Sequence, residues 1–234
     1  MRLILGFLSF GLLAEPLWLS LLDGSSTSGW HAAVTPSFPE SCWRLEEGAL
    51  RPVPGNQQVD IWSDKAYRNF ILDFEFKVDA KANGGIKYLI QRGSAWTSKR
   101  KKPDGIPYEV YREGTGGLEF QIVDDAGDEA KDPKRRCGAM YSLVAPTDPP
   151  PVGPGAFHSG RIVVQGDHIE HWLNGKRVVS VTLGTPEMES IWDNGKREDI
   201  KQMRTMAKRE SPIAITHHGS AVWYRNMRVQ ALPD

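Results

Sequence analysis

A series of short segments in which apolar and polar residues alternate does most to limit how this chain can fold. A period of two places successive side chains on opposite faces of a β-strand, so such segments are typical of half-buried antiparallel strands. In residues 71–78 every second side chain is a large apolar one, whereas Asp73, Glu75 and Lys77 fall on the other face. Gly, Pro, Asn or Asp bounds each segment, as expected of the turns between strands.

Three such segments, 161–165, 168–173 and 176–183, follow one another closely. Gly166-Asp167 and Asn174-Gly175 separate them, and both dipeptides favour tight hairpin turns. The pattern predicts a three-stranded meander, in which we assign Trp172 to the core. The C-terminal part repeats the pattern in 213–217 and 221–232.

Three regions interrupt the alternation. Residues 93–117 are rich in Lys, Gly and Pro and are interpreted as a long loop, and the five prolines of 146–154 predict an extended loop outside the sheets. Residues 186–209 have apolar side chains at spacings of mostly three and four, which predicts one or two short surface helices. About ten strands in a chain without repeats or composition shifts predict an all-β fold. We expect residues 15–234 to form a single jelly-roll domain, a sandwich of two antiparallel sheets.

The first fourteen residues have the order of a secretory signal peptide, with Arg2 before an apolar run and Ala14 at its end. An uncleaved anchor continuing to residue 22 would have to carry Glu15 and Pro16 inside the bilayer. We therefore interpret residues 1–14 as a cleaved leader. The protein is then exported to the periplasm or outside the cell, and its mature chain has no transmembrane segment.

Charge and cysteine content narrow the classes of function. The 29 basic side chains balance the 29 acidic ones, so no overall positive field favours a nucleic-acid partner. The two cysteines, Cys42 and Cys137, would close a long loop if they paired in an oxidising compartment. Two buried thiols that never pair are an equally good interpretation, and no Cys/His spacing indicates a zinc site.

A longer ordered series of motifs spans the chain. It runs through Leu21-Leu22-Asp23-Gly24, Gly29-Trp30, Trp43–Leu50, Asp60-Ile61-Trp62-Ser63, Phe70–Phe76, Asn83–Tyr88, Gly117–Asp125, Gly138–Tyr141, His171–Gly175, His218-Gly219 and Trp223–Met227. The series resembles the 3-keto-disaccharide hydrolase family, also described as the 3-keto-alpha-glucoside 1,2-lyase and 3-keto-2-hydroxyglucal hydratase domain. The resemblance implies a concanavalin-like jelly roll in an exported bacterial protein. The chain departs from many members at Thr216-His217-His218-Gly219, where those have Gln-Asp-His-Gly.

The resemblance implies chemistry on a sugar ring oxidised at C3. The ketone acidifies the C2–H, because loss of that proton gives an enolate, and the oxygen on C1 is then a leaving group β to the carbonyl. Proton abstraction and elimination break the glycosidic bond, and water can later add to the enone. An oxidoreductase must act upstream to supply the keto sugar, and the ligand of this protein is a 3-keto-glycoside or another carbohydrate.

Such a reaction needs a base near C2, a cation or donor beside the C3 oxygen, and an acid at the glycosidic oxygen. Glu119 and Gln121 share the polar face of one predicted strand, and we select Glu119 as base or acid. Lys87 follows two glycines that allow close approach of a ligand, and its ammonium suits an enolate. His218, before Gly219, could act as acid, base or metal ligand.

Further candidates are of second rank. Glu75 and Asp124 are additional carboxylates, although Asp124 needs a bulge or a strand end to reach the face of Glu119. Tyr88, Tyr141 and Trp62 could stack on a sugar ring. The sequence requires no cofactor, and a divalent metal ion on His218 with Glu119, Asp124 or Glu75 is possible only as a mixed nitrogen and oxygen site.

Two other functions remain open. A non-catalytic carbohydrate-binding module with the same concanavalin-like fold would bind a glycan by aromatic stacking and would need neither Glu119 nor Lys87. A glycosidase acting on unoxidised sugar would need a pair of carboxylates. The chain has no Glu-x-Asp-x-x-Glu motif, which disfavours the laminarinase-like version of that enzyme.

Overall fold

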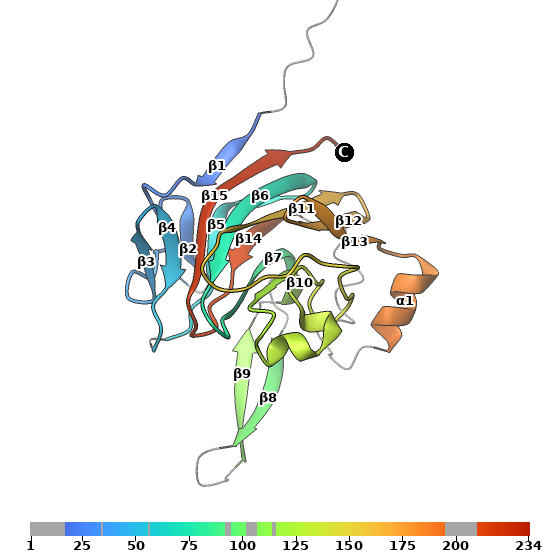
Figure 1. The fold of residues 1–234 in the computed structure, drawn as a ribbon, viewed down its shortest axis with the longest axis horizontal. Coiled ribbons are helices and arrows are strands. Elements are labelled where there is room, and N and C mark those ends of the chain that lie inside the picture. Colours follow the sequence, from blue (N-terminus) through green and yellow to red (C-terminus); the bar gives the residue numbers. More distant parts are fainter. Residues whose placement is uncertain are drawn as a thin grey trace, which may run out of the picture.

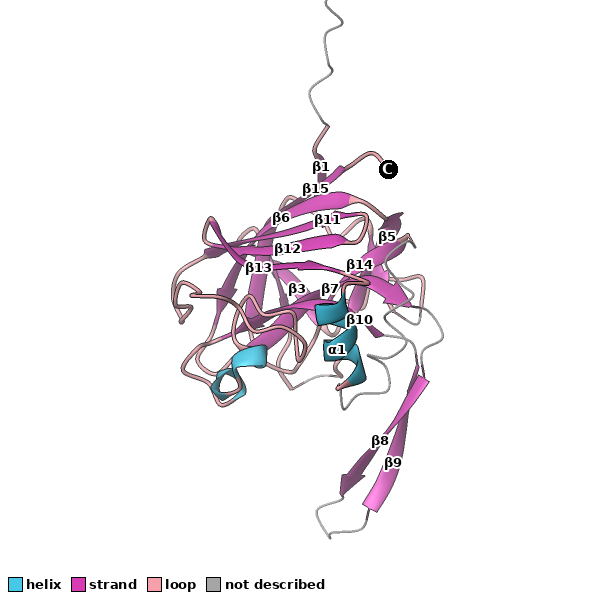
Figure 2. Ribbon diagram, turned by 90° about the vertical axis from the view of Figure 1, so that its right-hand side faces the viewer, coloured by secondary structure: helices cyan, strands magenta, loops and turns pink. Residues whose placement is uncertain are grey.

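The computed structural model describes residues 17–33, 35–55, 57–91, 95–101, 107–113, 116–194 and 210–234. The predicted leader, residues 1–14, lies outside this part of the chain. The fold is mostly β, with two antiparallel sheets packed face to face, as the alternating segments predicted (Figure 1). Figure 2 shows β6, β11 and β12 of one sheet above β7 and β10 of the other.

The larger sheet has eight strands. Along the sheet they follow the order β13 (Lys176–Thr182), β12 (His168–Leu173), β11 (His158–Gln165), β6 (Phe70–Val78), β15 (Val222–Ala231), β4 (Ala49–Pro52) and β3 (Trp43–Glu46), and β1 (Leu19–Leu22) pairs with β15. The predicted meander is therefore present as β11, β12 and β13. The five-stranded sheet has the order β10 (Gly116–Val123), β7 (Asn83–Gln91), β14 (Ser211–Ile215), β5 (Ile61–Tyr67) and β2 (Trp30–Ala32).

The hydrophobic core lies between the two sheets. On β6, burial alternates strictly along the strand, and the five inward side chains are Phe70, Leu72, Phe74, Phe76 and Val78. They pack against inward side chains of the facing sheet; the ring centroids of Phe74 and Phe120, for example, are 5.3 Å apart. Each fully buried side chain of this size contributes about 1.5–3 kcal/mol to the free energy of unfolding.

The assignment of Trp172 to the core is wrong. On β12 the inward residues are Ile169, His171 and Leu173, so Trp172 points outward and is half-buried. His171 occupies the core because both ring nitrogens have partners there: Nε2 is 2.7 Å from the Tyr88 hydroxyl, and Nδ1 is 3.0 Å from the carbonyl oxygen of Gly138. Burial lowers the pKa of His171 to about 4, so the ring is neutral near pH 7.

Outside the sheets, one predicted helix is present as α1 (Pro186–Asp193), and the rest of segment 186–209 lies almost wholly outside the described residues. The Thr185 hydroxyl caps α1 by accepting a hydrogen bond from the backbone N–H of Met188. Met188 and Trp192, four residues apart, bury their side chains in the core. Two short 3₁₀ helices, η1 (Glu129–Lys131) and η2 (Pro133–Arg135), precede the irregular segment that contains the five prolines.

The interpretation of 93–117 as a loop is wrong in part. Residues Ala95–Lys101 (β8) and Pro107–Glu113 (β9) form an antiparallel hairpin that projects away from both sheets (Figure 1). The hairpin pairs with neither sheet. A ribbon of this kind does not need one apolar face against a core, so the sequence lacks the usual strand signal.

Two bulges change which residues face outward. Asn226, with a φ of 51°, is an extra residue in β15, so that Arg225 and Arg228 both point away from the core. Leu89, with a φ of 49°, is likewise an extra residue, in β7. Tyr88 and Leu89 both join the main core, whereas Ile90 lies on the opposite, outer face of the five-stranded sheet.

Cys42 and Cys137 are both buried and free, so the structure contains two separate thiols. Burial raises the pKa of Cys137 to about 12. Among the described helices, α1 included, there is none with the length and apolar character needed to cross a bilayer.

Candidate active site

The candidate active site is a row of side chains across the outer face of the five-stranded sheet. Glu119 of β10 lies directly opposite Lys87 of β7, Lys87 opposite Ala214 of β14, and Ala214 opposite Trp62 of β5. Directly opposite residues of antiparallel strands share a face. The strand pairing therefore brings Glu119 and Lys87 together, as their selection from the sequence required.

Glu119 is almost fully buried, with 7% of its surface exposed. Among described side chains, its carboxylate has one hydrogen-bond contact, with the Thr216 hydroxyl, at 3.5 Å from Oε1. A Cβ placed on Gly85 would stand 2.2 Å from Oε1, so the carboxylate occupies the space that this glycine leaves. Glu119 is thus a confined carboxylate with unused hydrogen-bonding capacity, which suits a general base.

Lys87 leans from the row toward Asp60, and its Nζ is 3.8 Å from Oδ2 of that carboxylate. The other oxygen of Asp60 accepts a hydrogen bond from the backbone N–H of His217 at 2.9 Å. The His217 ring is buried edge-on against Trp43, and burial lowers its pKa. This chain of contacts fixes the lysine ammonium at the end of the sheet where Thr216 and Glu119 also meet.

Polar side chains continue the face on either side of Glu119. Gln121 lies two residues further along β10, is 1% exposed, and donates from Nε2 to the Asn83 side-chain oxygen at 3.1 Å. Tyr141 lies opposite Glu119 on an extra extended segment, and its backbone N–H donates to the Glu119 carbonyl. The Tyr141 hydroxyl is 3.3 Å from a carboxylate oxygen of Glu129. The structure thus places Gln121 and Tyr141 beside the predicted base.

Trp62 lies on the same face but is 4% exposed. It packs in a small apolar cluster with Ile90 and Ala214, next to Lys87. Its ring therefore packs into the sheet face beside Lys87. It does not present an open surface on which a sugar could stack. His31, opposite Trp62 on β2, ends the row with Nδ1 2.8 Å from Asp64.

His218 follows His217 just after the end of β14 and is exposed. Gly219 comes next with a φ of 82°, and its N–H donates to Nδ1 of His217 at 3.1 Å. This turn holds the buried His217 and leaves His218 at the rim of the face that carries Thr216.

Three of the sequence-selected residues lie elsewhere. The Tyr88 ring is fully buried in the core against His171, so it cannot stack on a sugar. Asp124 follows β10 and accepts the backbone N–H groups of Lys81 and Ala126, a turn-stabilising role. Glu75 belongs to the other sheet, where it accepts a hydrogen bond from Arg225 at 2.7 Å. Burial of Tyr88 contradicts its stacking role, whereas Asp124 and Glu75 lie away from Glu119, in a turn and in an ion pair.

Asp60 and Thr216 are site residues that sequence reasoning did not select. Each lies just outside the end of a strand, Asp60 before β5 and Thr216 after β14. At such positions the alternation of apolar and polar residues does not show which face a side chain is on. Asp60 could have been found from its position directly before the apolar pair Ile61-Trp62, with which β5 begins.

A bound metal ion needs several ligand side chains close together. In the part of the chain that the structure describes, no three His, Cys, Asp or Glu side chains lie close enough together to hold one ion. The described residues therefore do not supply a set of three such ligands that includes His218, and metal dependence stays a prediction.

Solved structures share this fold. A candidate glycosyl hydrolase from Parabacteroides distasonis ATCC 8503 matches with a TM-score of 0.72 at 22% identity, covering 92% of this chain and 94% of that one. A second such protein from the same organism matches with a TM-score of 0.64 at 25% identity, covering 92% of this chain and all of the other. Both confirm the two-sheet jelly-roll architecture.

The sequence profile of the 3-keto-alpha-glucoside-1,2-lyase-like domain matches residues 17–230. The fold defines the class, a protein with a jelly-roll domain of two antiparallel sheets. The chain belongs to the family of 3-keto-alpha-glucoside-1,2-lyase-like domains, as the ordered motifs predicted. A 3-keto-disaccharide hydrolase of Bacteroides thetaiotaomicron is 26% identical over 236 residues, which cover 92% of this chain and 78% of that protein.

Proposed function

We propose that the protein is an enzyme that cleaves 3-keto-glycosides by removing the C2 proton and eliminating the group on C1, and that it hydrates the product. The observation that carries the proposal is the position of Glu119 directly opposite Lys87 on a largely buried polar face. A carboxylate and a lysine that project from facing positions on one side of a sheet supply the two groups that enolate formation needs.

Glu119 is the base in this reaction. Its carboxylate takes the proton from C2, and the C2–H electron pair moves into the bond to C3, giving an enolate on the C3 oxygen. Thr216 and the lack of a side chain at Gly85 fix where the carboxylate lies. A positioned general base of this kind accelerates a reaction about 10²–10⁴-fold.

Lys87 is the cation that stabilises the enolate. Its Nζ, next to the Asp60 carboxylate, has protons available for the C3 oxygen, and its side chain is only 15% exposed. A charge in a site that excludes water stabilises developing negative charge more strongly than a hydrated charge does. Asp60 is a positioning residue that keeps the ammonium near the face of Glu119.

The bond from C1 to the glycosidic oxygen then breaks, and the enolate electrons form the C1–C2 double bond of an enone. The leaving oxygen takes a proton from an acid, and His218 at the exposed rim is the residue we assign to this role. In the second stage water adds to C1 and gives a proton back to His218, and Glu119, whose proton has exchanged with solvent, protonates C2. The sum of both stages is hydrolysis of the glycosidic bond.

The chemistry also defines the setting of the enzyme. An oxidoreductase that converts a secondary alcohol at C3 to a ketone must supply the substrate. The leader-like residues 1–14 support export, so both reactions are expected outside the cytoplasm. Fractionation of cells that express the full chain, with mass spectrometry of the mature N-terminus, tests this part of the proposal.

The decisive experiment incubates the protein with a 3-keto-disaccharide or its unoxidised parent in D₂O, with and without a chelator. We expect turnover of the keto sugar alone, with one deuterium at C2 of the released keto sugar above the level in a reaction without protein. Cleavage without enzyme-dependent deuterium would contradict the elimination route. Chelator sensitivity would assign a metal ion to the reaction.

Matched lysine variants test the site itself. Lys87→Met should lower turnover about 10²–10³-fold, in the range found for loss of one preorganised charge-stabilising group. Lys65→Met, which changes an exposed lysine on β5 of the same sheet, is the control and should keep full turnover. Equal activity of the two variants would remove Lys87 from the mechanism. If the protein binds keto and parent sugars and converts neither, it is a carbohydrate-binding module instead.

A further inference from the structure

A second groove lies on the outer face of the eight-stranded sheet, on the other side of the sandwich from Glu119. Its cavity volume is about 820 Å³, and the side chains that matter for its chemistry are Trp18, Asp73, Glu75, Arg161, Trp172 and Arg228. Nothing in the proposed reaction uses these residues. The groove therefore needs an explanation of its own.

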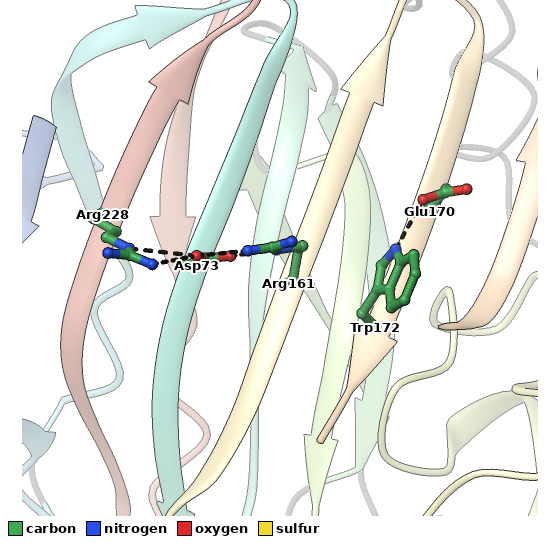
Figure 3. A network of polar contacts seen from close by, with 5 residues as sticks. All are labelled: Asp73, Arg161, Glu170, Trp172 and Arg228. Carbon is green, nitrogen blue, oxygen red and sulfur yellow. Dashed lines mark hydrogen bonds and ion pairs between the residues drawn. The ribbon is translucent and has the colours of Figure 1, made fainter. Parts of the chain in front are cut away.

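A row of cross-strand neighbours forms the floor of this groove. Arg228 of β15 lies opposite Asp73 of β6, Asp73 opposite Arg161 of β11, and Arg161 opposite Trp172 of β12. Arg161 binds both oxygens of Asp73, at 2.5 and 2.9 Å, and Arg228 donates to Oδ2 from the other side at 3.0 Å (Figure 3). The two guanidinium groups are thus held in fixed positions along the floor.

An aromatic ring stands at each end of the row. Trp172 donates its indole N–H to Glu170 at 2.8 Å, which fixes the ring beside Arg161 (Figure 3). At the other end, the Trp18 ring lies over the Arg228 guanidinium, 4.4 Å from its carbon atom. Both rings are half-buried, so each also has surface open to solvent. A fixed aromatic face is the surface that the apolar side of a sugar ring contacts.

The charges of the groove compensate one another. Burial alone would raise the pKa of Asp73, but the hydrogen bonds and charges of Arg161 and Arg228 hold it below the ordinary value. Glu75 is in turn paired with Arg225 at 2.7 Å. Asp23, the third acid of the lining, accepts hydrogen bonds from Ser25. The two lining arginines are therefore matched by acids, and the groove offers hydrogen bonds without strong attraction for an anion. This disfavours an anionic ligand and suits a neutral polyol.

The length of the row indicates the size of the ligand. Three strand intervals of about 4.8 Å separate Arg228 from Trp172, which gives roughly 14 Å along the floor. That distance exceeds one sugar ring. The bulge at Asn226 contributes to this arrangement, because it allows Arg225 and Arg228 to face the groove side of β15 together.

We propose that this groove is a second carbohydrate-binding site that holds a neutral oligosaccharide of several sugar units, with Trp18 and Trp172 as stacking platforms and the Arg228–Asp73–Arg161 row as the hydrogen-bonding floor. The site binds unoxidised sugar, so it is independent of the proposed reaction. It would keep the enzyme on a glycan while the opposite face acts on a keto sugar.

The test is a binding titration with cellohexaose, laminarihexaose and maltohexaose as neutral probes and a hyaluronan hexasaccharide as the acidic one. All proteins carry Glu119→Gln, so that cleavage does not enter the measurement. We expect one or more neutral hexasaccharides to bind, with affinity lowered about tenfold by Trp172→Ala, as for loss of roughly one aromatic contact, and restored in part by Trp172→Tyr. Trp18→Ala, directly before β1, should weaken binding similarly and guards against misfolding of the first variant.

Several outcomes would overturn the proposal. They are the absence of binding, neutral binding that neither tryptophan variant weakens, and binding of the acidic hexasaccharide alone. Sedimentation that shows a dimer broken by Trp172→Ala would assign the groove to self-association instead. Loss of keto-sugar turnover in the experiment above leaves these results unchanged, so the two proposals fail separately.

Discussion

The outer faces of the two sheets carry similar residue types in opposite arrangements. On the five-stranded sheet, Glu119 is buried and its carboxylate has a single long contact, with Thr216, among the described side chains. On the eight-stranded sheet, Asp73 accepts hydrogen bonds from two arginines and both of its oxygens are occupied. The first carboxylate has no arginine partner among the described residues, whereas two arginines hold the second in its ionised form.

The two faces therefore differ in how many hydrogen-bond partners each carboxylate has, and not in the type of residue that carries it. An uncommitted buried carboxylate costs stability and is retained where it does chemistry. A carboxylate bound by two guanidinium groups contributes to stability and provides a rigid surface. Glu75, selected from the sequence with Glu119, belongs to the second kind because Arg225 binds it.

The largest effect is expected at the uncommitted carboxylate. Glu119→Gln should lower turnover of a 3-keto-disaccharide about 10²–10⁴-fold, because an amide cannot accept the C2 proton. Steady-state rates on purified protein measure the loss, and urea unfolding confirms that the variant folds. Glu187→Gln, at an exposed position of α1, is the matched control. Retained turnover in Glu119→Gln would show that Glu119 is not the base, and that the two carboxylates do not differ in function.

A methyl group beside Glu119 should have the next largest effect. Gly85→Ala places a Cβ 2.2 Å from the present position of Oε1, so the flexible carboxylate must move. A displacement of about 1 Å at a reacting group can cost roughly 100-fold in rate. We expect that loss with little change in the urea midpoint. Gly153→Ala, where an added Cβ meets nothing within 4 Å, is the control; an equal loss there would contradict the explanation.

The free energy of unfolding should fall in acid because of His171 in the core between the two sheets. The pKa of His171 is about 4 in the folded protein and 6.5 ordinarily, so the unfolded chain binds a proton first as the pH falls. Stability is therefore complete above pH 6.5 and declines toward pH 4, by about 3 kcal/mol in total at about 1.4 kcal/mol per unit. Urea unfolding at a series of pH values measures the slope. His171→Gln should flatten it, and an unchanged slope would contradict the assignment.

The smallest effect is expected at the committed carboxylate. Asp73→Asn should lower the free energy of unfolding by on the order of 1 kcal/mol at neutral pH, because its arginine partners are about half exposed and solvent screens them. The folded pKa of Asp73 is lowered, so this contribution is present above pH 3.8 and is lost as the pH falls through the folded value. Equal stability of both proteins at neutral pH would show that the row contributes only to surface shape.

Much of the fold follows from the sequence because alternation and turn residues act locally. The strand β6 and the meander of β11, β12 and β13 are predictable from these signals alone. The hairpin of β8 and β9 is not, since its sequence includes the basic run 99–102 and lies in a segment rich in Gly and Pro. Trp172 is misassigned because a large aromatic ring is usually more buried than a histidine. Here His171 is the inward residue, since both of its ring nitrogens have partners in the core.

The site is less predictable than the fold. Glu119, Gln121 and Lys87 are found from strand facing and family resemblance together, and the register then places Glu119 opposite Lys87. Tyr88 follows Lys87 directly, so the alternation that turns Lys87 outward turns Tyr88 into the core, and the bulge at Leu89 comes only after it. Asp60 is missed because its role depends on a contact with Lys87 across strands that are distant in sequence.

The extra residue in β15 bears on how the length of this chain can change. A deletion within a regular strand turns every following side chain to the other face. Asn226 is the exception in β15, because its loss would leave Tyr224 and Met227 inward and Arg225 and Arg228 outward. Relatives that lack one residue at this point can therefore keep both the core and the arginine pair, so gaps within β15 are expected to concentrate there.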